Sequence, residues 1–520
     1  MAKTGKSPIG KLITWIIVLA VLIGLWGYWQ KVKYEGYVQN AEKLVQESNF
    51  KSAIPEYDNI IKLLQKYDNI LNLKPAEANH YCARGKAYLA INDFASAIND
   101  FDRAIGINSK DATYYYNRGV AYDISKDFKT AIKDFDKAIE LDPNYADAYT
   151  NRGVTYSKDG NKVKAMEDFT KALDLGSNNS KIYYSRGLVY MRNEDYKKAI
   201  ADFNKAIEIE PTSDSLYNSR GYSLLKNGEY QKALEDFNRA LDFNPKDSRY
   251  FSNRGETYLA LKEHKRAIDD FDMVIELKPK SSFAYCNRGI AYSGLVDYIS
   301  ALNDLNEAVR ITPRYVDALV NRANVNIYLK KYTDAINDCS RALAIDAKNS
   351  DAFLNRGVAG VHNKQYENGI KDLEQAMEMG LKGEKIYRNL GNAYYKTKDF
   401  VKGVEYLTKA IEAKTKDPAV YNTRGILYRM KGDYDLAIAD YTMAIGLNPK
   451  MASYYNNRGY AYFFKGDVDN AIANYTKCVE LDPGYSLAYA NRADAYIKKG
   501  DNTKAEFDLK KARDLGSKKR

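Results

Sequence analysis

The chain has 520 residues and a formal net charge of +11, with 45% hydrophobic and 28% charged residues. Its three His and four Cys are scattered, and it contains no nucleophile or phosphate-loop motif, so we expect no enzymatic activity, metal, cofactor or small-molecule substrate. Acidic and basic residues are interspersed, a pattern typical of a solvated surface and not of a nucleic-acid-binding stripe.

Residues 1–10 form a short basic tail, and residues 11–30 form an apolar stretch. After Lys11 this stretch carries no charge, and about 19 apolar residues at ~1.5 Å each give ~28 Å, enough for one bilayer crossing. All three Trp residues of the chain lie within it, which suits a membrane interface. A cleaved signal peptide is the alternative, but its apolar core would be shorter and followed by a small-residue cleavage site. We therefore predict a single uncleaved transmembrane helix over 11–30.

The lysines that flank this stretch predict its orientation. Lys3, Lys6 and Lys11 precede the apolar residues, whereas Lys31 and Lys33 follow them. Cytoplasmic flanks of membrane helices carry the excess of Lys and Arg. We therefore expect a single-pass membrane protein whose amino terminus is cytoplasmic and whose remaining chain is extracytoplasmic, which is the periplasm in a bacterium. The cytoplasmic side is the alternative.

Residues 31–77 are expected to hold a degenerate first helical hairpin and a linker. Their small and apolar residues follow the spacing of the later repeats if Asn40 is aligned with the Arg that marks each of those repeats, such as Arg118. The next repeat starts ten residues late. Residues 64–77 are therefore predicted to form either a longer second helix or a loop.

Residues 78–520 contain thirteen 34-residue repeats and a short basic tail. The type repeat is 112–145, in which an Arg-Gly step, Arg118-Gly119, is the clearest marker. The Arg recurs at 34-residue spacing, with Leu390 in its place in one repeat. It stands at Arg84, Arg118, Arg152, Arg186, Arg220, Arg254, Arg288, Arg322, Arg356, Arg424, Arg458 and Arg492.

Each repeat is predicted to form two helices. Apolar and small residues recur with a helical period over 113–124, and Asp127 is suited to cap a second helix that stops at Pro143. One such hairpin cannot bury its own apolar surface, but stacked neighbours can. The fold class is therefore all-α, an open solenoid of helical hairpins.

This pattern resembles the tetratricopeptide repeat (TPR) family, whose period is also 34 residues. With Gly119 counted as position 8, the family has small residues at 8, 20 and 27, aromatic residues at 11 and 24, and Pro at 32. The matching residues are Gly119, Ala131, Ala138, Tyr122, Phe135 and Pro143. The resemblance implies a right-handed α-solenoid (superhelix) of about 13 helix-turn-helix repeats, preceded here by one degenerate hairpin and the transmembrane helix.

Position 7 is Arg in twelve repeats, and position 23 on the second helix is Asp in eleven. Where Leu390 replaces the Arg, Tyr406 replaces the Asp, so the two residues change together; Arg458 with Asn474 is the exception. We predict an Arg–Asp bridge between the two helices of each repeat. A ligand-binding array of Arg residues is the alternative.

Repeats 8 to 10, residues 316–417, depart most from the pattern. The aromatic residue at position 11 becomes Asn326 and then Gly360, and the Ala at position 20 becomes Gly369 and Gly403. Gly in a helix interior costs about 1 kcal/mol relative to Ala. We interpret the block either as a hinge or as drift in a long array.

In the TPR family the first helices line a concave face that binds partners, and position 6 is exposed there. Here it is Asn in nine repeats: Asn117, Asn151, Asn253, Asn287, Asn321, Asn355, Asn389, Asn457 and Asn491. Such an asparagine ladder can hold the backbone of an extended peptide, because a side-chain amide both donates and accepts hydrogen bonds. The alternative is that these amides bond to neighbouring helices.

A second candidate is a basic and aromatic patch in repeats 10 to 12, which has the composition of a protein-binding hot spot. The predicted partner-binding residues are Lys385, Arg388, Asn392, Lys396, Arg429, Tyr460, Phe463 and Phe464. The alternative is that some of the aromatic residues pack against the next repeat.

These observations predict a membrane-anchored scaffold or assembly factor that recruits other proteins. A receptor or chaperone that holds extended peptides along the ladder is the alternative function. An RNA-binding solenoid is a third class, but no base-reading pair of residues recurs in the repeats, and we expect no nucleic-acid partner.

Overall fold

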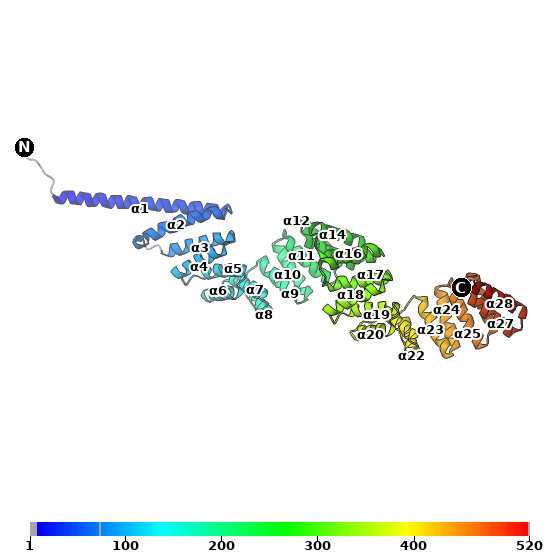
Figure 1. The fold of residues 1–520 in the computed structure, drawn as a ribbon. Helices are drawn as coiled ribbons and strands as arrows, with labels where there is room; N and C mark the ends of the chain where they lie inside the picture. The colour runs from blue at the N-terminus through cyan, green and yellow to red at the C-terminus, as the bar shows by residue number, and fades with distance from the viewer. Residues whose placement is uncertain (1–7, 72–73, 518–520) are drawn as a thin grey trace, which may run out of the picture. The chain divides into compact units, whose positions relative to one another are not determined.

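The computed structural model describes the backbone of residues 8–71 and 74–517 and the side chains of residues 18–66 and 77–516. This part of the chain forms 28 α-helices and no strand, and successive helices pair as antiparallel hairpins (Figure 1). The chain divides into two units at residues 250 and 251, within α13. Each unit is a stack of hairpins, so the prediction of an all-helical solenoid is confirmed.

The helices of the first unit, with the start of α13, are α1 (Pro8–Gln46), α2 (Phe50–Leu71), α3 (Lys74–Ala90), α4 (Phe94–Ile107), α5 (Ala112–Ile124), α6 (Phe128–Leu141), α7 (Ala146–Lys158), α8 (Lys162–Asp174), α9 (Ser180–Arg192), α10 (Tyr196–Ile209), α11 (Asp214–Lys226), α12 (Tyr230–Phe243) and α13 (Ser248–Ala260). The others are α14 (His264–Leu277), α15 (Ser282–Gly294), α16 (Tyr298–Ile311), α17 (Val316–Tyr328), α18 (Tyr332–Ile345), α19 (Ser350–His362), α20 (Tyr366–Glu378), α21 (Glu384–Lys396), α22 (Phe400–Glu412), α23 (Pro418–Lys431), α24 (Tyr434–Leu447), α25 (Ala452–Lys465), α26 (Val468–Leu481), α27 (Ser486–Lys499) and α28 (Asn502–Ser517).

The type repeat shows why each hairpin forms. The Asp127 side chain accepts a hydrogen bond from the Thr130 backbone N–H and caps α6, as predicted. Phe135 of α6 is fully buried against α5, where a Cβ added to Gly119 would lie 2.9 Å from the ring. Gly119 therefore allows the two helices to approach closely.

The turn between the helices has the same backbone conformation in every repeat. Position 15 always has a positive φ, whatever its side chain. These residues are Asn92, Lys126, Gly160, Glu194, Gly228, Lys262, Val296, Lys330, Lys364, Lys398, Gly432, Gly466 and Gly500. A single left-handed residue therefore closes each hairpin, and only Val296 is β-branched, the side-chain type least suited to this region.

Helices α1 and α2 form a hairpin that follows the same rules. Ser48 in its turn has φ 58°. Asn40 Nδ2 donates to Glu56 Oε1 at 3.0 Å, over the sixteen-residue separation of the Arg–Asp pairs. α2 continues to Leu71, so the longer second helix is observed; residues 72 and 73 of the predicted stretch lie outside the described residues. The Tyr34 hydroxyl lies 2.9 Å from His80 Nε2 and joins α1 to the first regular repeat.

No helix in the described residues is both long enough and apolar enough to cross a bilayer. The stretch predicted to do so, 11–30, lies on α1, but the side chains of 11–17 lie outside the described residues. From Val18 to Trp29 the large apolar side chains of α1 are all exposed. In Figure 1 the amino-terminal part of α1 extends beyond the end of α2.

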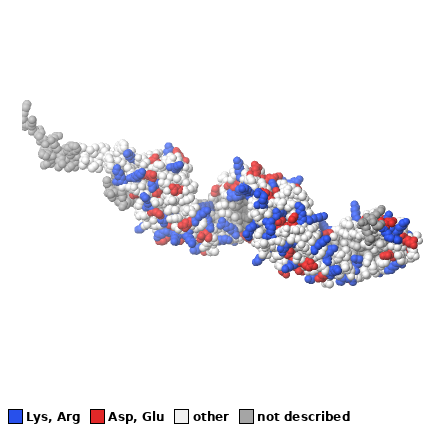
Figure 2. Space-filling model, in the orientation of Figure 1, with Lys and Arg blue, Asp and Glu red and all other residues white. Residues whose placement is uncertain are grey.

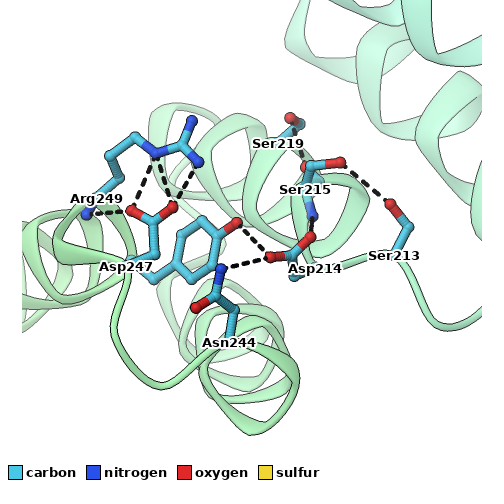
Figure 3. A network of polar contacts seen from close by, with 8 residues as sticks. Ser213, Asp214, Ser215, Ser219, Asn244, Asp247 and Arg249 are labelled. Carbon is cyan, nitrogen blue, oxygen red and sulfur yellow. Dashed lines mark hydrogen bonds and ion pairs between the residues drawn. The ribbon is translucent and has the colours of Figure 1, made fainter. Parts of the chain in front are cut away.

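A polar network joins the repeats at the end of the first unit (Figure 3). The Asp214 carboxylate, at the start of α11, accepts hydrogen bonds from the Tyr250 hydroxyl at 3.0 Å and from Asn244 Nδ2 at 3.2 Å. Tyr250 is fully buried. At this junction, one repeat is thus fixed to the next by a satisfied buried hydroxyl as well as by apolar packing.

Candidate functional site

The position-7 arginines are bonded inside the repeats, which is the predicted Arg–Asp bridge. In the type repeat, Arg118 Nε and Nη2 donate to the two Asp134 carboxylate oxygens at 2.8 and 2.7 Å. The same bidentate contact is present in all eleven repeats that have both residues. In the exception, Arg458 Nε donates to Asn474 Oδ1 at 2.8 Å.

A third hydrogen bond from these arginines links neighbouring repeats. Arg118 Nη1 donates to Asp102 Oδ1 at 2.6 Å, and Asp102 belongs to the second helix of the preceding repeat. The accepting position, 25, is Asp, Asn, Ser or Thr in different repeats. This contact could not be predicted from the sequence, because no single residue type marks the accepting position.

The charged pairs leave little for an external ligand to bind. The arginine side chains of the eleven pairs are only 13–27% exposed. Hydrogen bonding to Asp134 raises the pKa of Arg118, while burial raises the pKa of Asp168 in the next repeat. These contacts give the arginine array a structural role, and most of its hydrogen-bonding capacity is used within the repeats.

The ladder asparagines use their amide N–H groups within the array. Some donate to a carbonyl of their own helix, as Asn389 Nδ2 does to Lys385 O at 2.7 Å, and others to the preceding repeat, as Asn457 Nδ2 does to Asn422 Oδ1 at 2.9 Å. Donors in one of these two modes are Asn117, Asn151, Asn287, Asn321, Asn355, Asn389, Asn457 and Asn491. Asn253, the ninth member, lies half-buried on α13. Peptide binding by the ladder stays a prediction.

One part of the ladder lies in a pocket. Asn321 of α17, Asn355 of α19 and Lys385 of α21 line a cavity of about 290 Å³, together with the carboxylates of Asp317 and Asp351. Burial lowers the pKa of Lys385. The structure thus brings two ladder amides into one pocket with Lys385, a residue of the predicted patch.

The aromatic half of the predicted patch is a real cluster on α25. The Phe464 ring lies 4.5 Å from Tyr460 and 5.4 Å from Phe463, centroid to centroid. Arg429 of α23 lies over Tyr460 at 4.6 Å, and Lys498 of α27 lies over Phe463 at 4.8 Å. We call these five residues the aromatic patch. Lys498 was missed from the sequence, because its contact with the aromatic residues crosses to the next repeat.

The remaining predicted residues, all on α21, do not join this cluster through any contact described for the chain. Arg388 pairs with Glu384 at 3.0 Å and with Asp417 at 3.1 Å. Lys396 is exposed and lies over Tyr395, and Asn392 is half-buried. The basic and aromatic residues are thus two separate groups, and Arg388 is already paired with Glu384 of α21 and with Asp417, the residue before α23.

The surface charge is mixed. Lys and Arg alternate with Asp and Glu over the face of each unit that Figure 2 shows. Many of the exposed charges are paired along one helix, as Lys137 and Glu140 are at 2.7 Å. The excess of positive charge is therefore dispersed.

Tetratricopeptide repeat models match the sequence at many places. The matched residues are 112–145, 180–213, 215–247, 418–451 and 452–485 for one such model, 135–167 and 474–507 for a second, 248–281 and 384–417 for a third, and 85–123 for a model described as TPR repeat. Together these matches cover more than half of the chain. No curated protein sequence matches it.

Similar solved structures include three helical-repeat chains. Cut9–Hcn1, an APC/C hetero-tetramer, is 16% identical over 86% of this chain and 96% of its own, with a TM-score of 0.44. A tetratricopeptide repeat protein from Parabacteroides merdae is 22% identical over 48% and 98%, with a TM-score of 0.41. YrrB, a TPR protein, is 21% identical over 35% and 95%, with a TM-score of 0.33. The assignment rests on the family models: the repeats of this chain are tetratricopeptide repeats.

Proposed function

We propose that the chain is a membrane-anchored scaffold that recruits partner proteins, with the aromatic patch as its main contact. The observation that carries the proposal is the exposure of one ring of the cluster: Phe464 is 49% exposed although it touches the half-buried rings of Tyr460 and Phe463. Exposed clusters of large apolar side chains commonly mark protein-binding sites on soluble domains.

The chemistry of the aromatic patch suits a protein partner. Aromatic residues and Arg are enriched in binding hot spots, where a few buried side chains carry most of the binding energy. Arg429 and Lys498 already lie over the rings, and both would be desolvated with them in a complex. A partner that presents an apolar surface rimmed by acidic residues would be complementary to this arrangement.

The test is crosslinking in cells of the tagged full-length protein, followed by mass spectrometry. The variant Phe463→Ala/Phe464→Ala should reduce recovery of the main partner at least tenfold while the helical circular dichroism is unchanged. A matched control is Phe507→Ala, which removes a ring that is 67% exposed on α28, outside the aromatic patch. Equal recovery with the patch variant and with the control would refute the proposal.

The anchoring part of the proposal is supported by the apolar stretch 11–30, which has no charge after Lys11, and by the exposed apolar side chains of α1. Deletion of residues 1–30 should release the protein from alkali-washed membranes, whereas the full chain should stay bound. For the side of the membrane we propose the extracytoplasmic one. Protease added to the cytoplasmic face of sealed vesicles should then leave the repeats intact, and their digestion would place them in the cytoplasm.

A second candidate function, holding extended peptides, is favoured by the pocket at Asn321, Asn355 and Lys385. Its amides and its Lys could bind a peptide carbonyl or carboxylate, and its Asp residues could accept from peptide N–H groups. The variant Asn321→Ala/Asn355→Ala distinguishes the two functions. It should leave a scaffold's capture of folded partners unchanged and should weaken a receptor's binding to flexible segments.

A further inference from the structure

A pocket of about 510 Å³ lies in repeat 9, between α19 and α20 and beside α18. Its walls include Phe353, Arg356 and Gly360 of the first helix and Gly369 and Asp372 of the second. None of these residues is at a position that lines the predicted concave face. The pocket is therefore separate from the ladder and from the aromatic patch.

Comparison with the other repeats shows what the pocket lacks. Position 11 is Tyr in ten of the thirteen repeats but is Gly360 here. In repeat 3, Tyr156 at this position lies 6.0 Å from the Arg152 guanidinium and 5.3 Å from Lys164 Nζ, which are at positions 7 and 19. In repeat 9, positions 7 and 19 are Arg356 and Asn368, and both line the pocket.

The rest of the lining agrees with this comparison. In repeat 10, the Tyr394 hydroxyl donates to Glu374 Oε1 at 2.6 Å, and Glu374 is at position 25 of the preceding repeat. The residue at that position beside the pocket is Ser340, which also lines it. The pocket thus has the walls of a tyrosine site whose own tyrosine has been replaced by glycine.

We propose that this pocket receives a tyrosine side chain from a partner protein. The ring would lie beside the Arg356 guanidinium, which is within 5.5 Å of Phe353 and already part of an aromatic environment. The hydroxyl would reach Ser340 Oγ, as Tyr394 reaches Glu374. A tyrosine that fills a concave site of this size can act as an anchor of an interface.

Arg356 is more exposed than its equivalents, and its bond to the preceding repeat is the longest described, which favours an added contact. Its side chain is 27% exposed, against 13–23% for the other ten paired arginines. Its hydrogen bond to Ser340 Oγ is 3.4 Å long, against 2.6–3.1 Å for the equivalent bonds. An incoming ring would cover the guanidinium, and an incoming hydroxyl would give Ser340 a closer partner.

The first test uses p-cresol, the side-chain analogue of tyrosine, and the full-length protein, with binding measured by saturation-transfer NMR. The variant Gly360→Tyr would restore the missing side chain, but its Cβ would lie only 3.3 Å from Gly369 Cα and would be crowded. We therefore use Ser340→Phe, which closes the pocket from its exposed rim. Thr442→Phe is the matched control. Thr442 is at position 25, as Ser340 is, and the repeat that follows it has Tyr462 at position 11, where repeat 9 has Gly360. We expect Ser340→Phe to weaken p-cresol binding at least fivefold and Thr442→Phe to leave it unchanged.

The second test identifies the source of the ring. A photoreactive p-benzoylphenylalanine is placed at Gln375, on the pocket wall, and crosslinked peptides are sequenced. The proposal expects partner segments that contain a tyrosine, with a yield that falls at least fivefold in the Ser340→Phe background. It is overturned if wild type and Ser340→Phe bind p-cresol equally, or if the crosslinked segments lack tyrosine. The Phe463→Ala/Phe464→Ala variant should keep p-cresol binding, so failure of the aromatic patch and failure of this pocket are distinguishable.

Discussion

The Arg–Asp pair of the type repeat can be broken in three ways that the chain itself suggests. The change Asp134→Ala removes a buried carboxylate and leaves Arg118 without its two hydrogen bonds of 2.7 and 2.8 Å. Asp134→Asn imitates repeat 12, where Arg458 bonds to Asn474. The double change Arg118→Leu/Asp134→Tyr imitates repeat 10.

The expected losses of unfolding free energy differ, because only Asp134→Ala leaves the Arg118 charge without an acceptor at position 134. Loss of one partner of a buried ion pair costs about 3–5 kcal/mol, and Asp134→Ala should fall near about 3 kcal/mol because Asp102 still accepts from Arg118. Asp134→Asn keeps one good acceptor and should cost about 1–2 kcal/mol. The double change should cost less than about 1 kcal/mol, since apolar residues of suitable shape replace buried pairs at little cost.

The double change has a structural precedent in the chain. In repeat 10, Leu390 is fully buried, and Tyr406 stacks on Tyr394 with centroids 5.7 Å apart and planes 4° apart. The type repeat has Tyr122 at the position of Tyr394, so a tyrosine at 134 would find the same stacking partner.

Hydrogen exchange resolved on α5 and α6 is the appropriate assay, because stacked repeats open locally and a single global transition need not apply. The opening free energies of the three variants should rank as stated. The reasoning is refuted if the double variant opens as easily as Asp134→Ala, because the charge itself would then be required.

Three further predictions follow from particular side chains. Val296 has φ 65° and is 66% exposed. The substitution Val296→Gly should stabilise the repeat by about 1 kcal/mol, because left-handed backbone costs a side-chain-bearing residue about 1–2 kcal/mol. Hydrogen exchange on α15 and α16 should then slow, and faster exchange would contradict this. Burial raises the pKa of the Cys82 thiol to about 11 and of the other three thiols to about 12. The folded protein should therefore react with a disulfide reagent at pH 8 far more slowly than the unfolded one, and equal rates would count against the buried placement. Burial lowers the pKa of His80, so its contribution to stability is present above its unfolded pKa of about 6.5 and is lost as pH falls below that value; proteolysis of the α1–α2 hairpin should increase between pH 7 and 5.5, and His80→Gln should remove this dependence.

The repeats and the Arg–Asp bridge could be predicted because both are periodic. The paired change to Leu390 and Tyr406 identified the partners, and the contacts join the predicted residues in all eleven repeats that have both. The hairpin at Asn40 was found from the same register, which Ser48 and Glu56 follow in the structure. In a repeat protein, residues that contact each other can be recognised because they recur, or change together, at the same positions of every repeat.

The contacts between repeats and the surfaces were less predictable. The bond from Arg118 to Asp102 uses an acceptor position that tolerates several residue types, so no pattern marked it. Position 6 shows an amide but not its orientation, and the donors of Asn389 and Asn457 are used inside the array. In the sequence, Gly360 was only a departure from the pattern. The loss of a side chain does not show whether the space is left open or is filled by neighbouring residues, so the pocket could not be predicted.

The position-7 arginine bonds both within its own repeat and to the preceding repeat, and this affects how the number of repeats can change. Each of these arginines bonds sixteen residues forward and, in most repeats, sixteen residues back, so its acceptors lie one on either side of the junction between repeats. Excision or duplication of any 34-residue unit joins an arginine to acceptors at the same offsets. Unequal recombination between coding repeats would therefore yield a foldable chain at once, and the array can grow or shrink by whole units without a compensating mutation.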